Sequence, residues 1–367
     1  MLFFDGHLDL AMLAVHGRNM HAPPAVTTAG TDPVPAAVTL PSLREGNVRF
    51  ALATIFTEAD GDGPEGYPAG DAERAHRRGR AQLEVYETWR DEGRIAISLP
   101  KFLRHDPHVG HIRAGMGVAQ LQPLSLEERL SRAKPGVALH VGILMENADP
   151  IRSPDELAWW KERGVMAVGL AWARPSRYAM GNMTPHDEPV GLTDLGREMV
   201  RTMDALGIVH DVSHLSDRAM DELLALTDRP VIASHSNCRA LLNDPTNQRH
   251  LRDESIREIA RRGGVIGLNL CRNFIAPQPY SKDDPRPTIE QTIAHVEHIC
   301  GLVGHRNAVG LGSDLDGGFS ADDLPEGINR PSDLARLTDA LKDRAWSDDD
   351  RSRFAHENWA HFFGHAV

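Results

Sequence analysis

The sequence predicts an α/β protein that forms one (β/α)8 TIM barrel over residues 1–367, with long loops at the C-terminal face. Short apolar segments alternate with helical segments of ten to sixteen residues in the later chain, and this pattern is typical of parallel strands joined by helices. About eight strands can be counted, which favours a closed barrel over the alternative, a doubly wound open sheet. No Gly-x-Gly-x-x-Gly motif opens a helix, so the sequence gives nucleotide binding no support.

The amino-acid composition also limits the partners and the cellular compartment that this chain is expected to have. The chain is 41% apolar and 25% charged, which is ordinary for a globular protein with a large core. Its formal net charge of -12 argues against nucleic acid or an anionic membrane as the main partner. Three cysteines without Cys-x-x-Cys spacing favour a reducing compartment. We find no basic leader and no apolar run near 18 residues, so we expect a cytoplasmic protein without a membrane span.

The first half of the chain is expected to combine strands with long loops. Asp71 and Ser153 are suited to begin helices as N-caps, and Pro154 suits the first helical position. Segments rich in glycine and proline predict loops at 16–41 and 61–70, and the segment 104–128 has no clear pattern. The expected strands are 1–7, 48–56, 95–99 and 137–145, and the expected helices are 71–92 and 153–163.

The second half alternates more regularly between the two types of element. Thr193 is suited to begin a helix that Gly207 ends, because threonine caps the free N–H groups and glycine adopts a left-handed conformation. The expected strands are 165–170, 208–212, 230–233, 265–269 and 308–311. The expected helices are 193–206, 216–227, 253–262, 288–303, 331–342 and 347–363.

Polar side chains follow several of these strands at the point where each strand ends. In a parallel barrel the C-terminal strand ends surround one opening, so we expect the side chains to converge there. His7 and Asp9 are two residues apart and leave an extended segment on the same side. Each residue alone is weak evidence, since histidines and acids often cap helices or pack at a rim. The full set is His7, Asp9, Glu146, His214, His235, and Asp314 with Asp316.

The convergence of histidines and carboxylates predicts a metal centre, because buried unpaired carboxylates are costly without cations. Glu146 has two oxygens and can bridge two ions. One ion could be held by His7, Asp9 and Glu146, and the other by Glu146, His214 and His235. Nitrogen and oxygen ligands without thiolate suit two Zn²⁺ ions, with Mn²⁺, Co²⁺ or Fe²⁺ as alternatives. Two such ions can share a hydroxide and polarise a carbonyl group.

The sequence resembles the membrane dipeptidase (renal dipeptidase) family, peptidase family M19. The resemblance rests on Glu146 and on the segments FDGHLDL, DVSHLSD, VIASHSNCRAL, GGVIGLNL and VGLGSDLDGG, which span residues 4 to about 318. It implies an amidohydrolase-type barrel with two zinc ions that hydrolyses dipeptides, using the ligands named above. By the same resemblance Asp314 would interact with the bridging water and move protons. Arg249 would bind the carboxylate of the substrate.

One position departs from the family pattern. The family has a substrate-contacting histidine after the strand that follows the bridging glutamate, and this sequence has Trp172 there. Tryptophan cannot accept a proton or carry positive charge. His186, Arg174, Arg177 or Tyr178 could substitute, or could simply tie down the loop.

Three functions therefore stay open. The first is a metallo-dipeptidase that acts on small dipeptide-like substrates, and a homodimer would be compatible with it. The second is a metal-dependent hydrolase of another amide, lactam or ester, because Trp172 changes the substrate site. The third is a metal- and ligand-binding protein without turnover, which the intact ligand set and Asp314 disfavour.

Overall fold

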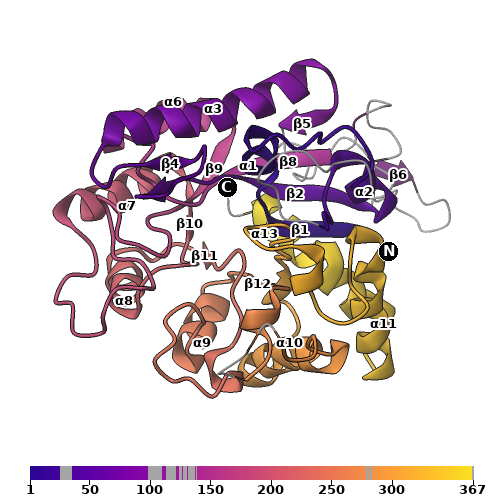
Figure 1. The fold of residues 1–367 in the computed structure, drawn as a ribbon. Coiled ribbons are helices and arrows are strands. Elements are labelled where there is room, and N and C mark those ends of the chain that lie inside the picture. Colours follow the sequence, from indigo (N-terminus) through magenta and orange to yellow (C-terminus); the bar gives the residue numbers. More distant parts are fainter. Residues whose placement is uncertain are drawn as a thin grey trace.

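Parallel strands form the centre of the computed structural model, which describes residues 1–24, 35–97, 110–112, 121–123, 126, 130, 137, 139–277, 281 and 283–365 (Figure 1). Eight of the described strands lie side by side in the order β11, β10, β9, β8, β2, β1, β13, β12. The two ends of this series also meet, because Ala233 and Ile266 form a parallel bridge and the Gly267 amide donates to the Ala233 carbonyl at 2.8 Å. The predicted (β/α)8 barrel is confirmed, and the open sheet is not formed.

The barrel strands are short and almost completely buried. Their bounds are β1 (Phe3–Leu8), β2 (Val48–Ile55), β8 (Leu139–Met145), β9 (Val165–Gly169), β10 (Val209–Asp211), β11 (Val231–Ile232), β12 (Ile266–Leu268) and β13 (Val309–Leu311). An additional strand, β5 (Ile95–Ile97), pairs with the first half of β8, and residues 98 and 99 of its predicted range lie outside the described residues.

Two small strand pairs lie apart from the barrel sheet. β3 (Glu58–Ala59) pairs with β4 (Gly66–Tyr67), so part of the predicted loop 61–70 is a strand. β6 (Gly110–Ile112) and β7 (Leu121–Pro123) pair antiparallel within the unassigned segment 104–128, most of which lies outside the described residues.

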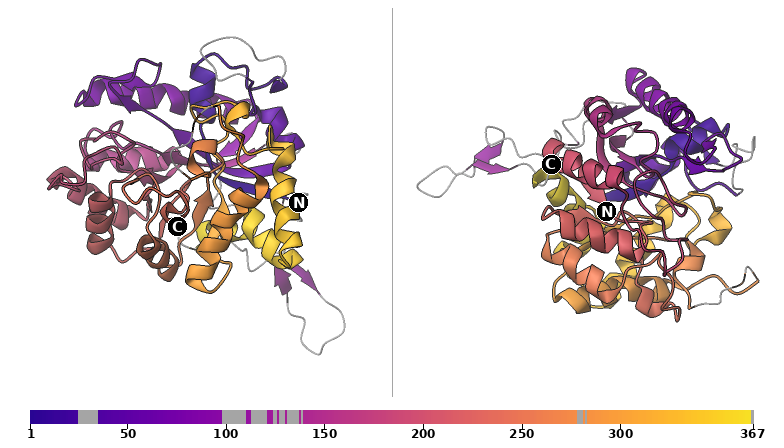
Figure 2. Two further views of the ribbon diagram at one scale, coloured as in Figure 1. Left: turned by 60° about the horizontal axis from the view of Figure 1, so that its bottom comes forward. Right: turned by 90° about the vertical axis from the view of Figure 1, so that its left-hand side faces the viewer.

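Helices surround the strands on the outside of the barrel (Figure 2). They are α1 (Leu10–Val15), α2 (Leu40–Glu45), α3 (Ala72–Asp91), α6 (Leu157–Glu162), α7 (Asp194–Leu206), α8 (Asp217–Leu226), α9 (Asp253–Arg261), α10 (Ile289–Val303), α11 (Ala335–Asp343), α12 (Asp348–Ser352) and α13 (Asn358–His365). Among the described helices none has the length and apolar character needed to cross a bilayer.

The helix ends test the capping predictions directly. The Asp71 side chain accepts a hydrogen bond from the Arg74 amide at the start of α3. Thr193 caps α7 in the same way, and Gly207 ends that helix in the left-handed conformation with φ of 67°. Ser153 is different, because its side chain makes no capping hydrogen bond and a 3₁₀ turn, Pro154–Glu156, precedes α6. Ser153 thus occupies the expected N-cap position with Pro154 after it, but its side chain does not supply the capping hydrogen bond.

Two predicted segments need correction. The predicted loop 16–41 overlaps the start of α2, and residues 25–34 within it lie outside the described residues. The predicted helix 347–363 is interrupted by a π-helical turn, Arg353–Glu357, between α12 and α13. The start of α2 did have a sequence signal, because Thr39 caps the helix and Pro41 lies in its first turn.

The N-terminal end of the barrel is filled by the last helix, α13. Trp359 and Phe363 pack against Phe4, with ring centroids 6.1 and 5.9 Å apart, in one buried cluster with apolar side chains of the neighbouring strands. A Cβ atom on Gly6 or Gly310 would lie 2.5 Å from the Trp359 indole, so glycine is required at both positions. Because this end is filled with apolar groups, the open polar end is the C-terminal one.

Candidate metal centre

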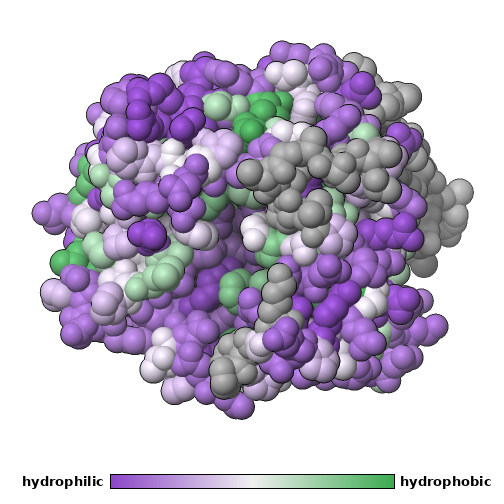
Figure 3. Space-filling model, in the orientation of Figure 1, coloured by the Kyte–Doolittle hydropathy of each residue, from purple (hydrophilic) through white to green (hydrophobic). Residues whose placement is uncertain are grey.

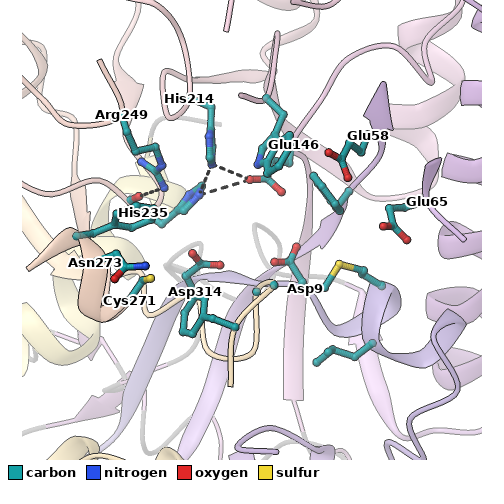
Figure 4. A pocket seen from close by; sticks show the side chains of 18 of the residues that line it. Asp9, Glu58, Glu65, Glu146, His214, His235, Arg249, Cys271, Asn273 and Asp314 are labelled. Carbon is teal, nitrogen blue, oxygen red and sulfur yellow. Dashed lines mark hydrogen bonds and ion pairs between the residues drawn. The ribbon is translucent and has the colours of Figure 1, made fainter. Parts of the chain in front are cut away.

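The five predicted metal ligands lie together at the C-terminal end of the barrel. Figure 4 shows four of them, Asp9, Glu146, His214 and His235. His7 lies in β1 and Asp9 follows as the N-cap of α1, while Glu146 comes directly after β8. His214 and His235 lie in the short segments after β10 and β11. All five residues are buried, with at most 8% of any of them exposed. The closed barrel thus brings together residues that are far apart in the sequence.

Glu146 lies at the centre of this arrangement and faces histidines with both of its oxygens. Its Oε1 atom lies 3.2 Å from His214 Nε2 and 3.4 Å from His235 Nε2. Its Oε2 atom lies 3.7 Å from His7 Nε2, and the same nitrogen lies 3.7 Å from an Asp9 oxygen. The two oxygens therefore face two separate sets of donors, as the predicted division into two ligand sets requires.

The Nε2 atoms of the three histidines face one another and the carboxylates, and this arrangement fits metal binding. His7 Nε2 is buried and has no hydrogen-bond partner in the described part of the chain. His214 Nε2 and His235 Nε2 face each other at 2.9 Å beside the Glu146 carboxylate. Potential ligand atoms of Glu146, His214 and His235 lie within 4.8 Å of one another, as do those of His7, Asp9 and Asp314. Mixed imidazole and carboxylate donors of this kind suit a divalent transition metal.

Burial and neighbouring charges shift the pKa values of several ionisable groups in this site. Burial raises the pKa of Asp314 to about 7, and the negative charge of Asp9 adds to this. Burial lowers the pKa of His7, but the charges of Glu146 and Asp9 outweigh this effect and raise it to about 10. Burial lowers the pKa values of His214 and His235, which favours the neutral imidazole that binds metals. The site thus combines several carboxyl groups with two neutral imidazoles, those of His214 and His235.

Asp314 lies beside the ligands and is held in a defined position. Its Oδ2 atom accepts a hydrogen bond of 2.9 Å from the Asn269 side chain, and its backbone amide donates to the His7 carbonyl at 3.2 Å. A Cβ atom on Gly317 would lie 1.9 Å from the other Asp314 oxygen and 2.8 Å from Asp9, so glycine leaves the space for both carboxylates.

Two of the site residues have strained backbones. His214 and Asp314 adopt left-handed conformations, with φ of 65° and 59°. Side chains other than glycine occupy this region at a cost, and such residues gather at functional sites. The strain accompanies the sharp turns that aim both side chains back over the barrel opening.

A cavity of about 460 Å³ opens above the ligands. The face shown in Figure 3 is hollowed near its centre, where hydrophilic residues predominate. Five of the residues discussed above line the cavity: Asp9, Glu146, His214, His235 and Asp314. The cavity therefore gives a small molecule access to the candidate metal centre.

Arg249 lines one wall of the cavity, as its predicted role in binding a substrate carboxylate requires. Its guanidinium donates to the Ser236 hydroxyl at 3.0 Å and to the His235 carbonyl at 2.8 Å. The guanidinium carbon lies 5.0 Å from the centre of the Phe274 ring, and Nε has no hydrogen-bond partner within the described residues. The side chain is thus fixed in place and keeps a donor free of protein partners.

Trp172 also lines the cavity, so the departure from the family pattern lies beside the candidate metal centre. Its ring centroid is 5.1 Å from that of Phe56 and 5.7 Å from that of His214. The four residues considered as substitutes do not line this cavity. Three of them bond to backbone carbonyls instead. They are His186 at the surface, the buried Tyr178 hydroxyl, and the Arg177 guanidinium, which donates to Arg152 at 3.0 Å. The structure favours a role for these residues in holding the loop.

Asp316 does not join the candidate metal centre, although its position in the sequence suggested that it could. Its carboxylate is fully buried, forms an ion pair with Arg18, and accepts hydrogen bonds from the backbone amides of Ala37 and Val38. It therefore connects the strand end to the segment that precedes α2, and its role is structural.

The sequence analysis missed other residues around the cavity. Glu58, Glu65 and His16 line it, and His16 Nε2 bonds to Glu65 at 2.6 Å. Glu58 and Glu65 lie on the opposite side of Glu146 from Arg249 in Figure 4. No local sequence pattern around Glu58, Glu65 or His16 indicated that these residues line the cavity. Asn269, which bonds to Asp314, could have been found, because it is the last residue of a predicted strand.

Comparison with known proteins agrees with the fold and the motifs. The family model described as membrane dipeptidase (peptidase family M19) matches residues 1–366. The chain belongs to this family.

Individual curated relatives have modest sequence identity to this chain and match only part of it. Dipeptidase tcpJ of Claviceps purpurea is 35% identical over 156 residues, which is 42% of this chain and 34% of that protein. An uncharacterised dipeptidase of Schizosaccharomyces pombe, C3A11.10c, is 29% identical over 53% of this chain and 45% of that protein. The matched regions thus cover less than half of these two relatives.

Two solved structures match over the whole chain. A dipeptidase described as a metallo peptidase of family M19 has a TM-score of 0.77 and 22% identity, and the match covers 100% of this chain and 98% of that one. A metallo peptidase from Rhodobacter sphaeroides, solved with a phosphinate mimic of the dipeptide L-Ala-D-Ala, has a TM-score of 0.74 and 23% identity over 100% and 99% of the two chains. At this identity the likeness supports the fold.

Proposed function

We propose that the protein is a binuclear-metal dipeptidase that hydrolyses the peptide bond of small dipeptides. The observation that carries the proposal is the position of Glu146, whose two oxygens face separate sets of nitrogen donors at the base of a cavity. Membership of the membrane dipeptidase family supports the same reaction. A mimic of a dipeptide occupies the related Rhodobacter sphaeroides structure, which agrees with a substrate of this size.

The chain would divide its ligands between two ions. His7, Asp9 and Glu146 would hold one, and Glu146, His214 and His235 would hold the other. Two Zn²⁺ ions suit the donors best, with Mn²⁺, Co²⁺ or Fe²⁺ as alternatives. When bound, the ions supply an activated water and polarise the scissile carbonyl.

Asp314 would move the proton in this reaction. Its carboxyl lies beside the proposed ligands His7 and Asp9, and a carboxylate in this position can accept a proton and then donate it. It would take a proton from the attacking water and deliver it to the leaving amine. The hydrogen bond from Asn269 holds one oxygen, which leaves the other facing Gly317 and the ligands.

The walls of the cavity carry charges that match those of a dipeptide. Arg249, which lines the cavity, would bind the substrate carboxylate through paired charge-assisted hydrogen bonds. Glu58 and Glu65, on the other side of Glu146, would favour the ammonium end. Trp172 would cover the substrate as an apolar surface and would restrict the side chains that can enter.

Metal content and hydrolysis measured on one preparation would test the proposal. We expect close to two equivalents of metal, cleavage of dipeptides that a chelator abolishes and zinc restores, and no cleavage of longer peptides. Binding of less than one equivalent would contradict the shared ligand set.

The second candidate is a metal-dependent hydrolase of another small amide, lactam or ester. Trp172 favours it, because this residue lines the cavity where the family has a histidine. Two bound metals without dipeptide cleavage, followed by turnover of one of these substrates in a panel, would support this candidate over the first.

Localisation and assembly are also proposals. Cys238, Cys271 and Cys300 are all free thiols, which supports the expected cytoplasmic location. Fractionation of cells with an antibody against the protein would test the location. Light scattering of the purified protein would test whether it forms the expected homodimer.

A further inference from the structure

The Ser234 side chain contacts two different candidate ligands at once. His235 Nδ1 lies 2.8 Å from the Ser234 oxygen, and His7 Nδ1 lies 3.2 Å from the same oxygen. These two histidines belong to different ligand sets, because His7 lies near Asp9 whereas His235 lies near His214. One buried hydroxyl therefore connects both halves of the candidate metal centre.

Asp211 decides which way the hydroxyl proton points. The Ser234 hydroxyl donates to Asp211 Oδ2 at 2.6 Å. The other Asp211 oxygen accepts the backbone amides of Ser213 and Ser234, at 3.0 and 2.9 Å. A hydroxyl has one proton and two lone pairs, so after donating to a carboxylate its oxygen can only accept from the two rings. The Ser213 hydroxyl lies farther away, at 3.4 Å.

Hydrogen bonding at Nδ1 fixes the opposite nitrogen of each ring. If Nδ1 carries the proton and donates to Ser234, then Nε2 keeps its lone pair and faces Glu146, 3.7 Å away for His7 and 3.4 Å away for His235. His7, Asp211 and His235 could by themselves form a metal site, since ligand atoms of the three lie within 4.8 Å of one another. The Ser234 hydroxyl contacts all three of these residues. Its hydrogen bonds with Asp211 therefore affect how the His7 and His235 rings are oriented.

We propose that Ser234 and Asp211 form a positioning pair that sets the tautomer and orientation of one histidine in each metal site. Loss of the pair should weaken the binding of both ions together. Groups that orient metal-binding histidines typically contribute about 10- to 100-fold in affinity. The proposal rests on the metal centre of the proposed function.

The two residues can be tested separately by substitution. Ser234→Ala removes the common acceptor. Asp211→Asn keeps the size of the side chain but reverses the hydrogen bond, because its amide would donate to Ser234. The Ser234 proton must then point at one ring, which forces that ring to carry its proton on Nε2, where it cannot bind metal. Ser236→Ala is the matched control, since the Ser236 hydroxyl bonds to Arg249 and Ser213 and to neither ring.

The full-length proteins would be stripped of metal and titrated with Zn²⁺ against a chromophoric chelator, with circular dichroism as a check of folding. We expect both Ser234→Ala and Asp211→Asn to lose at least tenfold in Zn²⁺ affinity and Ser236→Ala to stay within twofold of the parent. Affinities within twofold of the parent for the first two variants would overturn the proposal. If Ser234→Ala does not fold, the isosteric Asp211→Asn decides.

A spectrum of the unsubstituted protein gives an independent answer. In metal-free protein labelled with ¹⁵N-histidine, His235 should be neutral with its proton on Nδ1. A proton on Nε2 would refute the positioning pair whether or not either variant folds. Failure of the parent to bind Zn²⁺ would refute the metal centre instead, and the spectrum would still test the hydrogen bonds.

Discussion

Replacement of Asp314 by asparagine should separate proton transfer from metal binding. Asparagine has the same shape but cannot accept or release a proton near pH 7. It can still accept the hydrogen bond from Asn269 through its carbonyl oxygen. It also tolerates the left-handed backbone at this position, where φ is 59°, better than alanine would. The Asp314→Asn protein should therefore fold and retain its ligands.

The size of the effect follows from the role of the carboxyl. The carboxylate can act first as a base towards the attacking water and then as an acid towards the leaving amine, which asparagine cannot do. General acid–base catalysis contributes typically about 10²- to 10⁴-fold. Its loss should lower kcat by this factor, which corresponds to about 2.7 to 5.4 kcal/mol of transition-state stabilisation.

The assay would compare kcat for a dipeptide with metal content measured on the same samples. Asp60→Asn is a matched control, because Asp60 also has a left-handed backbone, with φ of 56°, and does not line the cavity. We expect the control to keep full activity. An Asp314→Asn protein with two bound metals and a kcat within twofold of the parent would show that the proposed proton transfer is wrong.

Other predictions concern the substrate, the buried ion pair and pH. Arg249→Lys removes a bidentate contact, so KM for a free dipeptide should rise at least tenfold, whereas KM for its C-terminal amide should not. An equal rise in KM for both substrates would refute a contact with the carboxylate. Arg18→Met leaves Asp316 charged and unpaired in the interior, so the free energy of unfolding in urea should fall by about 3 to 5 kcal/mol; a loss below about 1 kcal/mol would contradict the buried pair. Burial lowers the pKa of His356, whose ring donates to the Leu2 carbonyl, from 6.5 to about 4. As pH falls, the unfolded chain therefore binds a proton first, and stability present above pH 6.5 should be lost towards pH 4. His356→Gln should reduce the slope of unfolding free energy against pH by up to about 1.4 kcal/mol per pH unit. An unchanged slope would refute the assignment.

Much of the fold and of the metal centre could be predicted because both depend on local patterns. Apolar runs bounded by turn residues specify short buried strands, and capping residues such as Thr193 and Gly207 specify helix ends. In a parallel barrel, the position after a strand already determines the end of the molecule at which a side chain lies. For this reason Glu146, His214 and His235 could be assigned to one opening before any contact was known.

The tertiary structure decided what each polar group contacts. Asp314 and Asp316 are two residues apart and look equivalent in the sequence. Asp314 faces the candidate metal ligands, and Asp316 pairs with Arg18, which is 298 positions away in the chain. Likewise, no local pattern connects Ser234 to both His7 and His235.

The physical reason is the range over which the two kinds of information act. Backbone geometry repeats over a few residues, so strands, helices and their ends are encoded by nearby side chains. A buried polar group must find a partner or an ion wherever the packed chain supplies one, because leaving it unpaired is costly. The sequence by itself determined the barrel and the polar groups at its C-terminal opening. Packing of the whole chain determined the wall of the cavity, the role of each carboxylate and the hydrogen bonds that orient the histidines.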